Sequence, residues 1–230
     1  MLRKITVMIL VTGFISLVGS LMANEVTPEE LEKWFNSDTL DPPNYTYVNE
    51  GELVFLKFKP EKTIHHHSSL MIIEEKSLND GWVKMRQCHK NMDIFSEVQI
   101  VFKAGRVKNV KVISAVNIDR AWVEDSTVQL VNVKKDARIC IEGYSKALTM
   151  NDDGSYTLHN GPFMRRFLDG YYPMHVSLDV KYQGTGLKMD DISPAIQDGF
   201  TLNSDKEQLD VDAWFEGKLR TKIRFSIETL

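Results

Sequence analysis

The stretch LDVDAWFEGKLRTKIRFSI, residues 209–227, contains two runs in which apolar and polar side chains alternate. Alternation with a period of two is typical of β-strands that bury one face and expose the other. Pairing Phe215 with Leu219 in an antiparallel hairpin keeps the apolar side chains of both runs on one face. The opposite face then pairs Trp214 with Arg220, Asp212 with Lys222 and Asp210 with Arg224. The pattern therefore predicts a solvated face for these acids rather than a catalytic role.

The same alternation recurs along most of the chain. The clearest further example is 174–182, where Met174, Val176 and Leu178 alternate with polar residues. Other strand-like runs lie at 52–58, 69–75, 81–88, 97–103, 107–114, 127–133, 137–149 and 155–159. About ten short strands with few helices predict a mainly β fold, namely an antiparallel β-sandwich or a barrel-like variant with Greek-key connections.

A second hairpin is expected within 148–158. A loop of Asp152, Asp153 and Gly154 pairs Leu148 with Leu158 and places the glycine at a left-handed position. A shorter, two-residue loop is rejected because it would place Leu148 opposite His159 and mix the two faces.

The N-terminal segment has the features of an export signal. Arg3 and Lys4 precede an uncharged run from Ile5 to Ala23. This pattern predicts a signal peptide at 1–23, cleaved after Ala23, and a periplasmic or secreted protein. Cleavage after Ser20 and retention as an uncleaved anchor are the alternatives.

The expected mature chain begins with a helix at 24–38. Thr27 is a suitable N-cap, Pro28 suits the first helical position, and Glu30 completes a capping box. A single β-sandwich-like domain is expected at 39–230, with a subdivision near residue 150 left open. Scattered glycines and acids at 183–206 predict a long loop.

The charge balance restricts the partners. The formal charge is −4, and loss of Arg3 and Lys4 with the signal peptide makes it −6. This argues against nucleic acid and against an anionic membrane as the main partner, although basic patches remain compatible with it. Membrane association is expected only if the signal segment is uncleaved.

The chain has two cysteines, Cys88 and Cys140. In an oxidising compartment, such a pair is expected to form a disulfide. The alternative is that a free thiolate binds a metal.

A run of three histidines, His65–His67, suggests a metal site. On a strand, His65 and His67 share one face and His66 lies on the other. No cofactor is predicted, but a copper site formed by imidazole and sulfur ligands is an alternative. Its candidate ligands are His65, His67, His89 and Met92. Acid clusters at 152–153, 190–191 and Asp198 lack the spacing of a calcium-binding loop.

The segment PFMRRFLDGYYP, residues 162–173, is the strongest candidate binding site. It combines aromatic rings with arginines, which are enriched at binding hot spots. Its candidate residues are Phe163, Arg165, Arg166, Phe167, Tyr171 and Tyr172. The alternative is that the rings close one end of the core while the arginines pair with nearby acids.

The sequence contains no G-x-S-x-G, H-E-x-x-H, P-loop or dinucleotide-binding motif. We therefore expect a non-enzymatic module that binds a partner protein or a small ligand in the cell envelope. The alternatives are a copper-handling protein and a hydrolase of envelope polymers.

Overall fold

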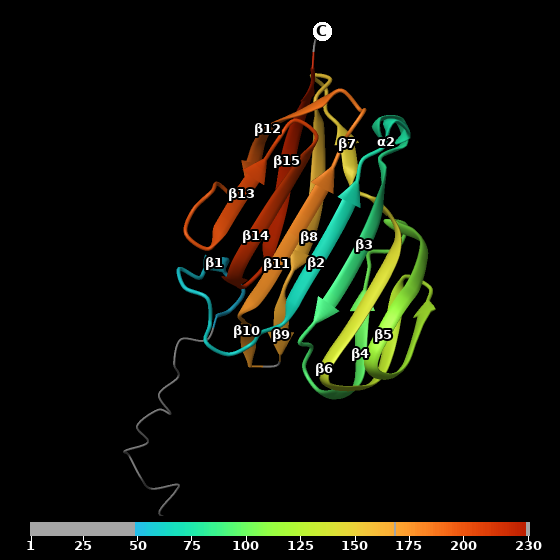
Figure 1. Cartoon of the computed structure of the whole chain (residues 1–230), viewed down its shortest axis with the longest axis vertical. Helices are drawn as coiled ribbons and strands as arrows, with labels where there is room; N and C mark the ends of the chain where they lie inside the picture. The colour runs from blue at the N-terminus through green and yellow to red at the C-terminus, as the bar shows by residue number, and fades with distance from the viewer. Residues whose placement is uncertain (1–48, 168, 229–230) are drawn as a thin grey trace, which may run out of the picture. The chain divides into compact units, whose positions relative to one another are not determined.

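The computed structural model describes residues 49–167 and 169–228, which form three β-sheets (Figure 1). The largest sheet has nine strands in the order β1–β14–β11–β2–β3–β6–β4, with β13 beside β14 and β5 beside β6. These strands are β1 (Val54–Phe55), β2 (His66–Ile72), β3 (Trp82–Lys90), β4 (Phe95–Val101), β5 (Val107–Glu124), β6 (Thr127–Lys146), β11 (Met174–Lys181), β13 (Phe200–Ser204) and β14 (Gln208–Glu216). Among its pairings, β2 and β11 run parallel.

The second sheet has four antiparallel strands in the order β12–β15–β8–β7. Its strands are β7 (Leu148–Met150), β8 (Tyr156–Phe163), β12 (Leu187–Ser193) and β15 (Leu219–Ile227). The third is a hairpin of β9 (Arg165–Phe167) and β10 (Gly170–Tyr172). The mainly β, sandwich-type fold is thus as expected, and its sheets are open at the edges rather than closed into a barrel.

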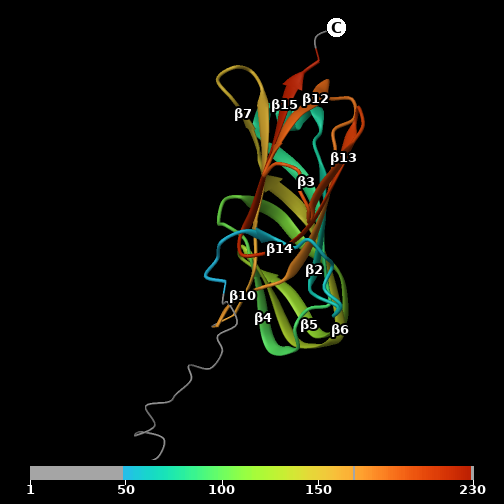
Figure 2. The ribbon, with the colours of Figure 1, turned by 90° about the vertical axis from the view of Figure 1, so that its left-hand side faces the viewer.

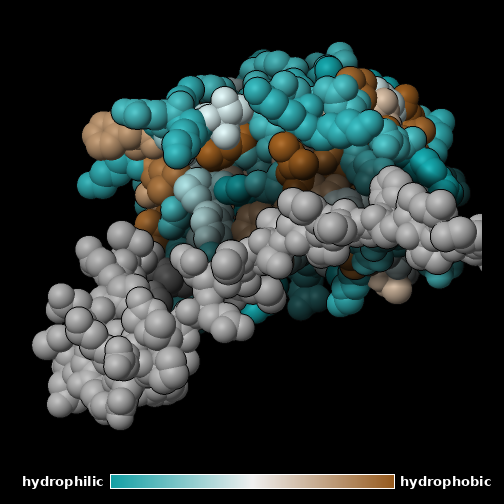
Figure 3. Space-filling view, turned by 90° about the horizontal axis from the view of Figure 1, so that it is seen from below, coloured by the Kyte–Doolittle hydropathy of each residue, from teal (hydrophilic) through white to brown (hydrophobic). Residues whose placement is uncertain are grey.

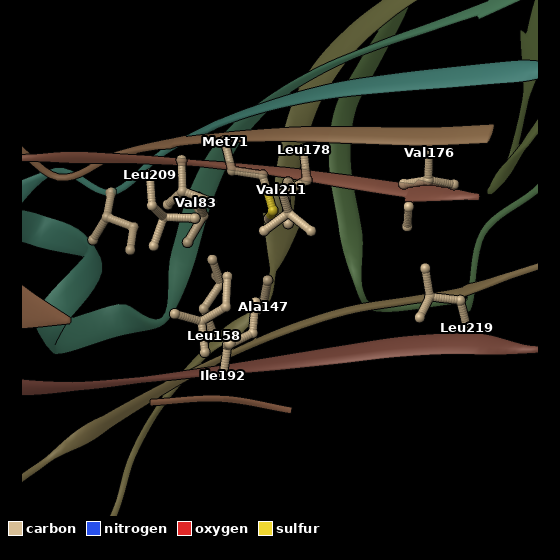
Figure 4. Packing of buried hydrophobic residues seen from close by; sticks show 14 of the residues in the cluster. Met71, Val83, Ala147, Leu158, Val176, Leu178, Ile192, Leu209, Val211 and Leu219 are labelled. Atoms are coloured by element: carbon tan, nitrogen blue, oxygen red, sulfur yellow. The ribbon is translucent and has the colours of Figure 1, made fainter. Parts of the chain in front are cut away.

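The hydrophobic core lies between the nine-stranded and the four-stranded sheet. Met71, Leu178 and Val211 project from the larger sheet towards Leu158 and Leu219 of the smaller one (Figure 4). Alternate residues of β11, β14 and β15 contribute to this core, so the period-two alternation of these runs is satisfied on both sheets.

The prediction of a hairpin at 209–227 is wrong, because β14 and β15 belong to different sheets. Phe215 and Leu219 are both fully buried, but their strands face each other across the core. Alternation reveals which face is buried and not which strand is the neighbour, since both arrangements bury the same side chains.

The polar pairs expected on the outer face of that hairpin are therefore absent from the described residues. Asp212 instead lies beside Ser177, Asp210 lies beside Asp179, and Arg224 forms an ion pair with Asp153.

The hairpin predicted at 148–158 is confirmed. Leu148 pairs with Leu158 and Met150 with Tyr156, and Asn151 donates to the carbonyl of Ser155 at 2.8 Å. Gly154 has a φ of 79°, the left-handed conformation that its position requires.

A second hydrophobic core is formed mainly by side chains of β4, β5 and β6. These three strands lie together at the lower end of the described region in Figure 2. The sequence predicted shorter strands at 107–114, 127–133 and 137–149. The two long strands contain asparagine and aspartate residues with positive φ, where β5 also shifts register against β6. Such irregularities reset the side-chain alternation, so each long strand looks fragmented in the sequence.

Two other elements differ from expectation. The region 183–206 contains β12 and β13 rather than one long loop. A short helix, α2 (Glu75–Asp80), connects β2 to β3 and ends at Gly81, whose φ is 71°.

Cys88 and Cys140 form a disulfide, as predicted, between directly opposed positions of β3 and β6. The signal peptide at 1–23 and the helix at 24–38 lie outside the described residues. Within 49–167 and 169–228, no helix is both long and apolar enough to cross a membrane.

Candidate functional site

The aromatic–arginine segment runs from the end of β8 through the β9–β10 hairpin. Arg165 pairs with Tyr172, and Arg166 pairs with Tyr171. Because neighbouring residues of a strand point to opposite faces, Arg165, Phe167 and Tyr172 share one face of the hairpin. Arg166 and Tyr171 share the other.

Arg165 is tied to an acid in the β3–β4 connection. Its Nε donates to Oδ2 of Asp93 at 2.9 Å, and its Nη2 donates to Oδ1 at 2.6 Å. The guanidinium also lies 5.2 Å from the ring centroid of Phe167 and 5.4 Å from that of Tyr172. This bidentate pair holds the hairpin against the β3–β4 connection and orients both rings.

The side chains of Phe163 and Tyr171 are buried inside the protein. Phe163 is 6% exposed and belongs to the sandwich core. Tyr171 is 7% exposed, and its backbone N–H donates to the carbonyl of Asn49 at 3.1 Å. The guanidinium of Arg166 and the ammonium of Lys218 lie over its ring at 5.6 and 5.2 Å. These two aromatic rings therefore stabilise this end of the fold.

Arg166, Phe167 and Tyr172 are at least partly accessible to solvent. The ring of Phe167 lies 5.3 Å from Tyr172 and 5.9 Å from Phe95, which is 46% exposed at the start of β4. Arg166 is exposed on the opposite face of the hairpin. We call Phe95, Arg166, Phe167 and Tyr172 the hairpin surface. Seen from this end, hydrophobic residues are exposed among hydrophilic ones (Figure 3).

The histidines predicted as metal ligands converge directly beneath this hairpin. Nε2 of His65 lies 3.0 Å from Nδ1 of His89, and the rings of His67 and His89 are 4.6 Å apart. The ring of His67 also lies 4.7 Å from Phe163. Met92 is buried in the second core. Two candidate sites that are far apart in the sequence are thus neighbours in the structure.

Burial keeps the three clustered histidines neutral. It lowers the pKa of His67 to about 3 and that of His65 to about 4, where the charge of Asp93 partly opposes the effect. The pKa of His89 is also well below its ordinary value, because that ring is buried beside His67. Within the described part of the chain, Nε2 of His67 and Nε2 of His89 have no hydrogen-bond partner.

The described residues include no group of three or more His, Cys, Asp or Glu side chains arranged to hold a metal ion. The hydrogen bond between His65 and His89 already occupies two of the ring nitrogens. The sulfur of Cys88 is in the disulfide. A metal would have to displace the hydrogen bond and reorient the rings.

The outer face of β2, β11 and β14 carries a network of polar side chains that was not predicted from the sequence. Nε2 of His66 lies 2.8 Å from Oγ of Ser177, which donates to Asp212 at 3.3 Å. Asp212 also binds Nε2 of His175 at 2.6 Å and Nε1 of Trp214 at 2.8 Å. The rings of His66, His175 and Trp214 are stacked, with centroids 4.0 and 3.9 Å apart.

Within this network, the lowered pKa values keep His66 neutral and Asp212 ionised at neutral pH. Burial, the neighbouring His175 and Lys90 lower the pKa of His66 to about 4. Partial burial acts to raise the pKa of Asp212, but hydrogen bonds from His175, Trp214 and Ser177 lower it overall. His175 and Ser177 are among the polar residues that alternate with Met174 and Val176 in the sequence, but only strand order brings Asp212 beside them.

This network does not have the order of a catalytic triad. In a triad, the histidine contacts the serine through one nitrogen and the acid through the other. Here Asp212 binds Nε2 of His175, the same nitrogen that lies 3.5 Å from Oγ of Ser177. The arrangement therefore gives Ser177 no histidine base oriented by the acid.

A cleft of about 610 Å³ lies far from the hairpin, at the end of the molecule where β12 is labelled in Figure 1. Its lining is mixed and includes Lys181, Gln183, Asp205 and Glu207 beside Leu187. None of the predicted site residues contributes to it.

The sequence matches no protein-family model and no curated protein. Among solved structures, one similar chain is an M1 zinc metallopeptidase mutant from Deinococcus radiodurans bound to a Tyr-Ser-Ala substrate, with a TM-score of 0.37 and 8% identity. A two-domain M1 zinc metallopeptidase mutant bound to L-tryptophan gives a TM-score of 0.34 and 9% identity. The alignments cover 78% of this chain but only 43% and 44% of those chains. Similarity this weak carries no argument about function.

Proposed function

We propose that this protein is an exported, non-enzymatic β-sandwich module that binds a partner protein or a small ligand through the hairpin surface. The observation that carries the proposal is the row of rings formed by Phe95, which is exposed, and by Phe167 and Tyr172, which are half-buried. Arginine and aromatic side chains of this kind dominate the binding energy of many interfaces.

The hairpin surface is organised before any partner arrives. The ion pair between Arg165 and Asp93 holds the guanidinium against two of the rings, so their side chains lose little freedom on binding. Arg166 has no ion-pair partner among the described residues and is available to an anionic group. The surface thus combines fixed apolar contacts with one adaptable charge.

The disulfide supports the exported location. Such bonds persist in oxidising compartments and are rare in the cytosol. A partner is therefore sought in the periplasmic or secreted fraction.

Affinity retention tests the proposal. The mature protein is immobilised and exposed to the exported fraction of the producing cells, and the retained molecules are compared between variants. We expect Phe167→Ala combined with Arg166→Ala to abolish retention of a molecule that the natural sequence holds, while the melting temperature falls by no more than about 5 °C.

A matched control is Ile227→Ala combined with Arg220→Ala, which removes one exposed apolar and one exposed basic side chain from β15. Retention by this control variant is expected to be unchanged. Equal retention by both variants would contradict a role for the hairpin surface.

Copper binding is a second candidate, favoured by the convergence of His65, His67 and His89 and by their two unpartnered ring nitrogens. Imidazole is a good copper ligand when neutral. Copper titration followed by native mass measurement tests this function. A retained copper ion that is lost in His67→Leu would support it, and the absence of any retained copper would exclude it.

A further inference from the structure

A concentration of positive charge covers the outer face of β3, β6 and β5. The register places Lys84 beside Tyr144, Lys90 beside Arg138, and Lys146 beside Trp82, with Lys108 opposite Tyr144 on the next strand. We call Lys84, Lys90, Lys108, Arg138 and Lys146 the basic face. All five side chains are exposed.

These charges are not balanced locally. Glu142 is the single acid at the outward positions of these rows, and it already binds Arg86 at 3.3 Å and Lys111 at 2.8 Å. Within 49–167 and 169–228, no residue of the basic face has a carboxylate at ion-pair distance. A chain with a formal charge of −4 therefore gathers a clear excess of positive charge on one face.

The rings of Trp82 and Tyr144 lie among the lysines of this face and make cation–π contacts with them. The ammonium of Lys108 lies 4.2 Å from the ring centroid of Trp82 and 5.7 Å from that of Tyr144. The ammoniums of Lys146 and Lys76 lie 5.8 Å from Trp82 and 5.5 Å from Tyr144, respectively. Tryptophan and tyrosine are also the residues enriched where proteins meet the headgroups of a bilayer.

The geometry of the basic face indicates a planar partner. Strand spacing of about 5 Å and a repeat of about 7 Å for alternate residues spread the charges in two dimensions. Most of them are lysines, which act as point charges without the directional fork of arginine. Ile113 and Val116, on the adjoining edge strand β5, are 40% and 48% exposed.

We infer that the basic face docks this protein on the surface of an anionic phospholipid bilayer. The negative net charge does not oppose this contact strongly, because salt screens charges beyond about 8 Å at physiological ionic strength. The local excess of lysine and arginine therefore governs the attraction to lipid phosphates. The inference concerns a surface separate from the hairpin surface and does not depend on it.

Vesicle sedimentation with the full mature chain tests the inference. We expect binding to vesicles that contain phosphatidylglycerol, little binding to pure phosphatidylcholine vesicles, and release at high salt. Lys84→Glu combined with Lys90→Glu is expected to lower the partition coefficient at least about tenfold. Lys84→Gln combined with Lys90→Gln, a milder change, is expected to give a smaller loss and serves if the first variant fails to fold.

The matched control is Lys188→Glu combined with Lys222→Glu, which makes the same change of net charge at exposed positions of the four-stranded sheet. We expect it to lower the partition coefficient less than about threefold. Equal losses in the two charge-reversal variants would overturn the inference, because net charge alone would then explain binding. Binding to soluble polyphosphate without binding to the anionic vesicles would also overturn it.

Discussion

Phe163 and Phe167 lie four residues apart in the same aromatic segment, yet they belong to different regions of the molecule. Phe163 is 6% exposed in the sandwich core, whereas Phe167 lies in the hairpin surface between Phe95 and Tyr172. Arg165 and Arg166 divide similarly, one in an ion pair with Asp93 and the other exposed. Residues of the types typical of binding sites can therefore be structural or accessible even when they are only one to four positions apart in the sequence.

The largest expected effect separates the two phenylalanines. Phe163→Ala should lower the free energy of unfolding by about 3–5 kcal/mol, because it leaves a cavity in the core. Phe167→Ala should lower it by less than about 1 kcal/mol. Denaturant unfolding of both variants measures the difference, and equal losses would show that the division is wrong.

The disulfide is expected to matter almost as much, although it lies on the outer face of the nine-stranded sheet. Its cysteines are 52 residues apart in sequence. Replacing both by serine should lower the free energy of unfolding by about 3–4 kcal/mol, because the unfolded chain regains the entropy of an open loop. Chemical unfolding under non-reducing conditions checks this value. Unchanged stability would show that the crosslink adds nothing to the strand pairing.

Acid pH should act through the interior histidines. His67 has a pKa of about 3 when folded and 6.5 as the reference for the unfolded chain, and the pKa of His89 is likewise depressed. The unfolded state therefore binds more protons below pH 6.5, so stability is complete above that pH and falls as the pH decreases. His65, whose pKa in the folded protein is about 4, contributes in the same way, so His65 and His67 together lose roughly 2.5 kcal/mol between pH 7 and pH 5.5, and the other depressed histidines add to this loss.

The variant His67→Leu sharpens this prediction. Leucine cannot take up a proton and leaves no unpaired ring nitrogen in the core, so the loss of stability between pH 7 and pH 5.5 should decrease by roughly 1.3 kcal/mol. Unfolding curves at pH 7 and pH 5.5 measure it for both proteins. An unchanged dependence on pH in His67→Leu would contradict the neutral state of that ring.

The smallest effect distinguishes the two arginines. Arg165→Ala should lower the free energy of unfolding by about 1–3 kcal/mol, between the values for exposed and buried ion pairs, because it leaves Asp93 half-buried and unpaired. Arg166→Ala should change it by less than about 0.5 kcal/mol. Thermal unfolding of both variants decides, and a larger loss for Arg166→Ala would reverse the assignment.

Local sequence patterns reveal which face of a strand is buried and how a tight turn is built, but they do not reveal which strands are neighbours. Alternation identified the buried residues of β11, β14 and β15, and turn chemistry fixed the register of β7 with β8. The pairing of β14 with β15 failed because a strand buries the same side chains whether its neighbour lies beside it or across the core.

The candidate site was predictable only as separate pieces. The sequence identified the aromatic–arginine segment and the histidine run, but their convergence depends on parallel pairing of β2 with β11 and on the link from Arg165 to Asp93. The cluster of Asp212, His175 and Ser177 likewise requires strand order, which local patterns do not contain.

Site-specific photo-cross-linking tests most directly whether the hairpin surface meets a partner. A photoreactive phenylalanine analogue replaces Phe167 in one protein and the exposed Ile227 in another, and both are irradiated in the exported fraction of the producing cells. We predict a discrete cross-linked product from position 167 and none from position 227. No product from position 167, or the same product from both positions, would contradict the account.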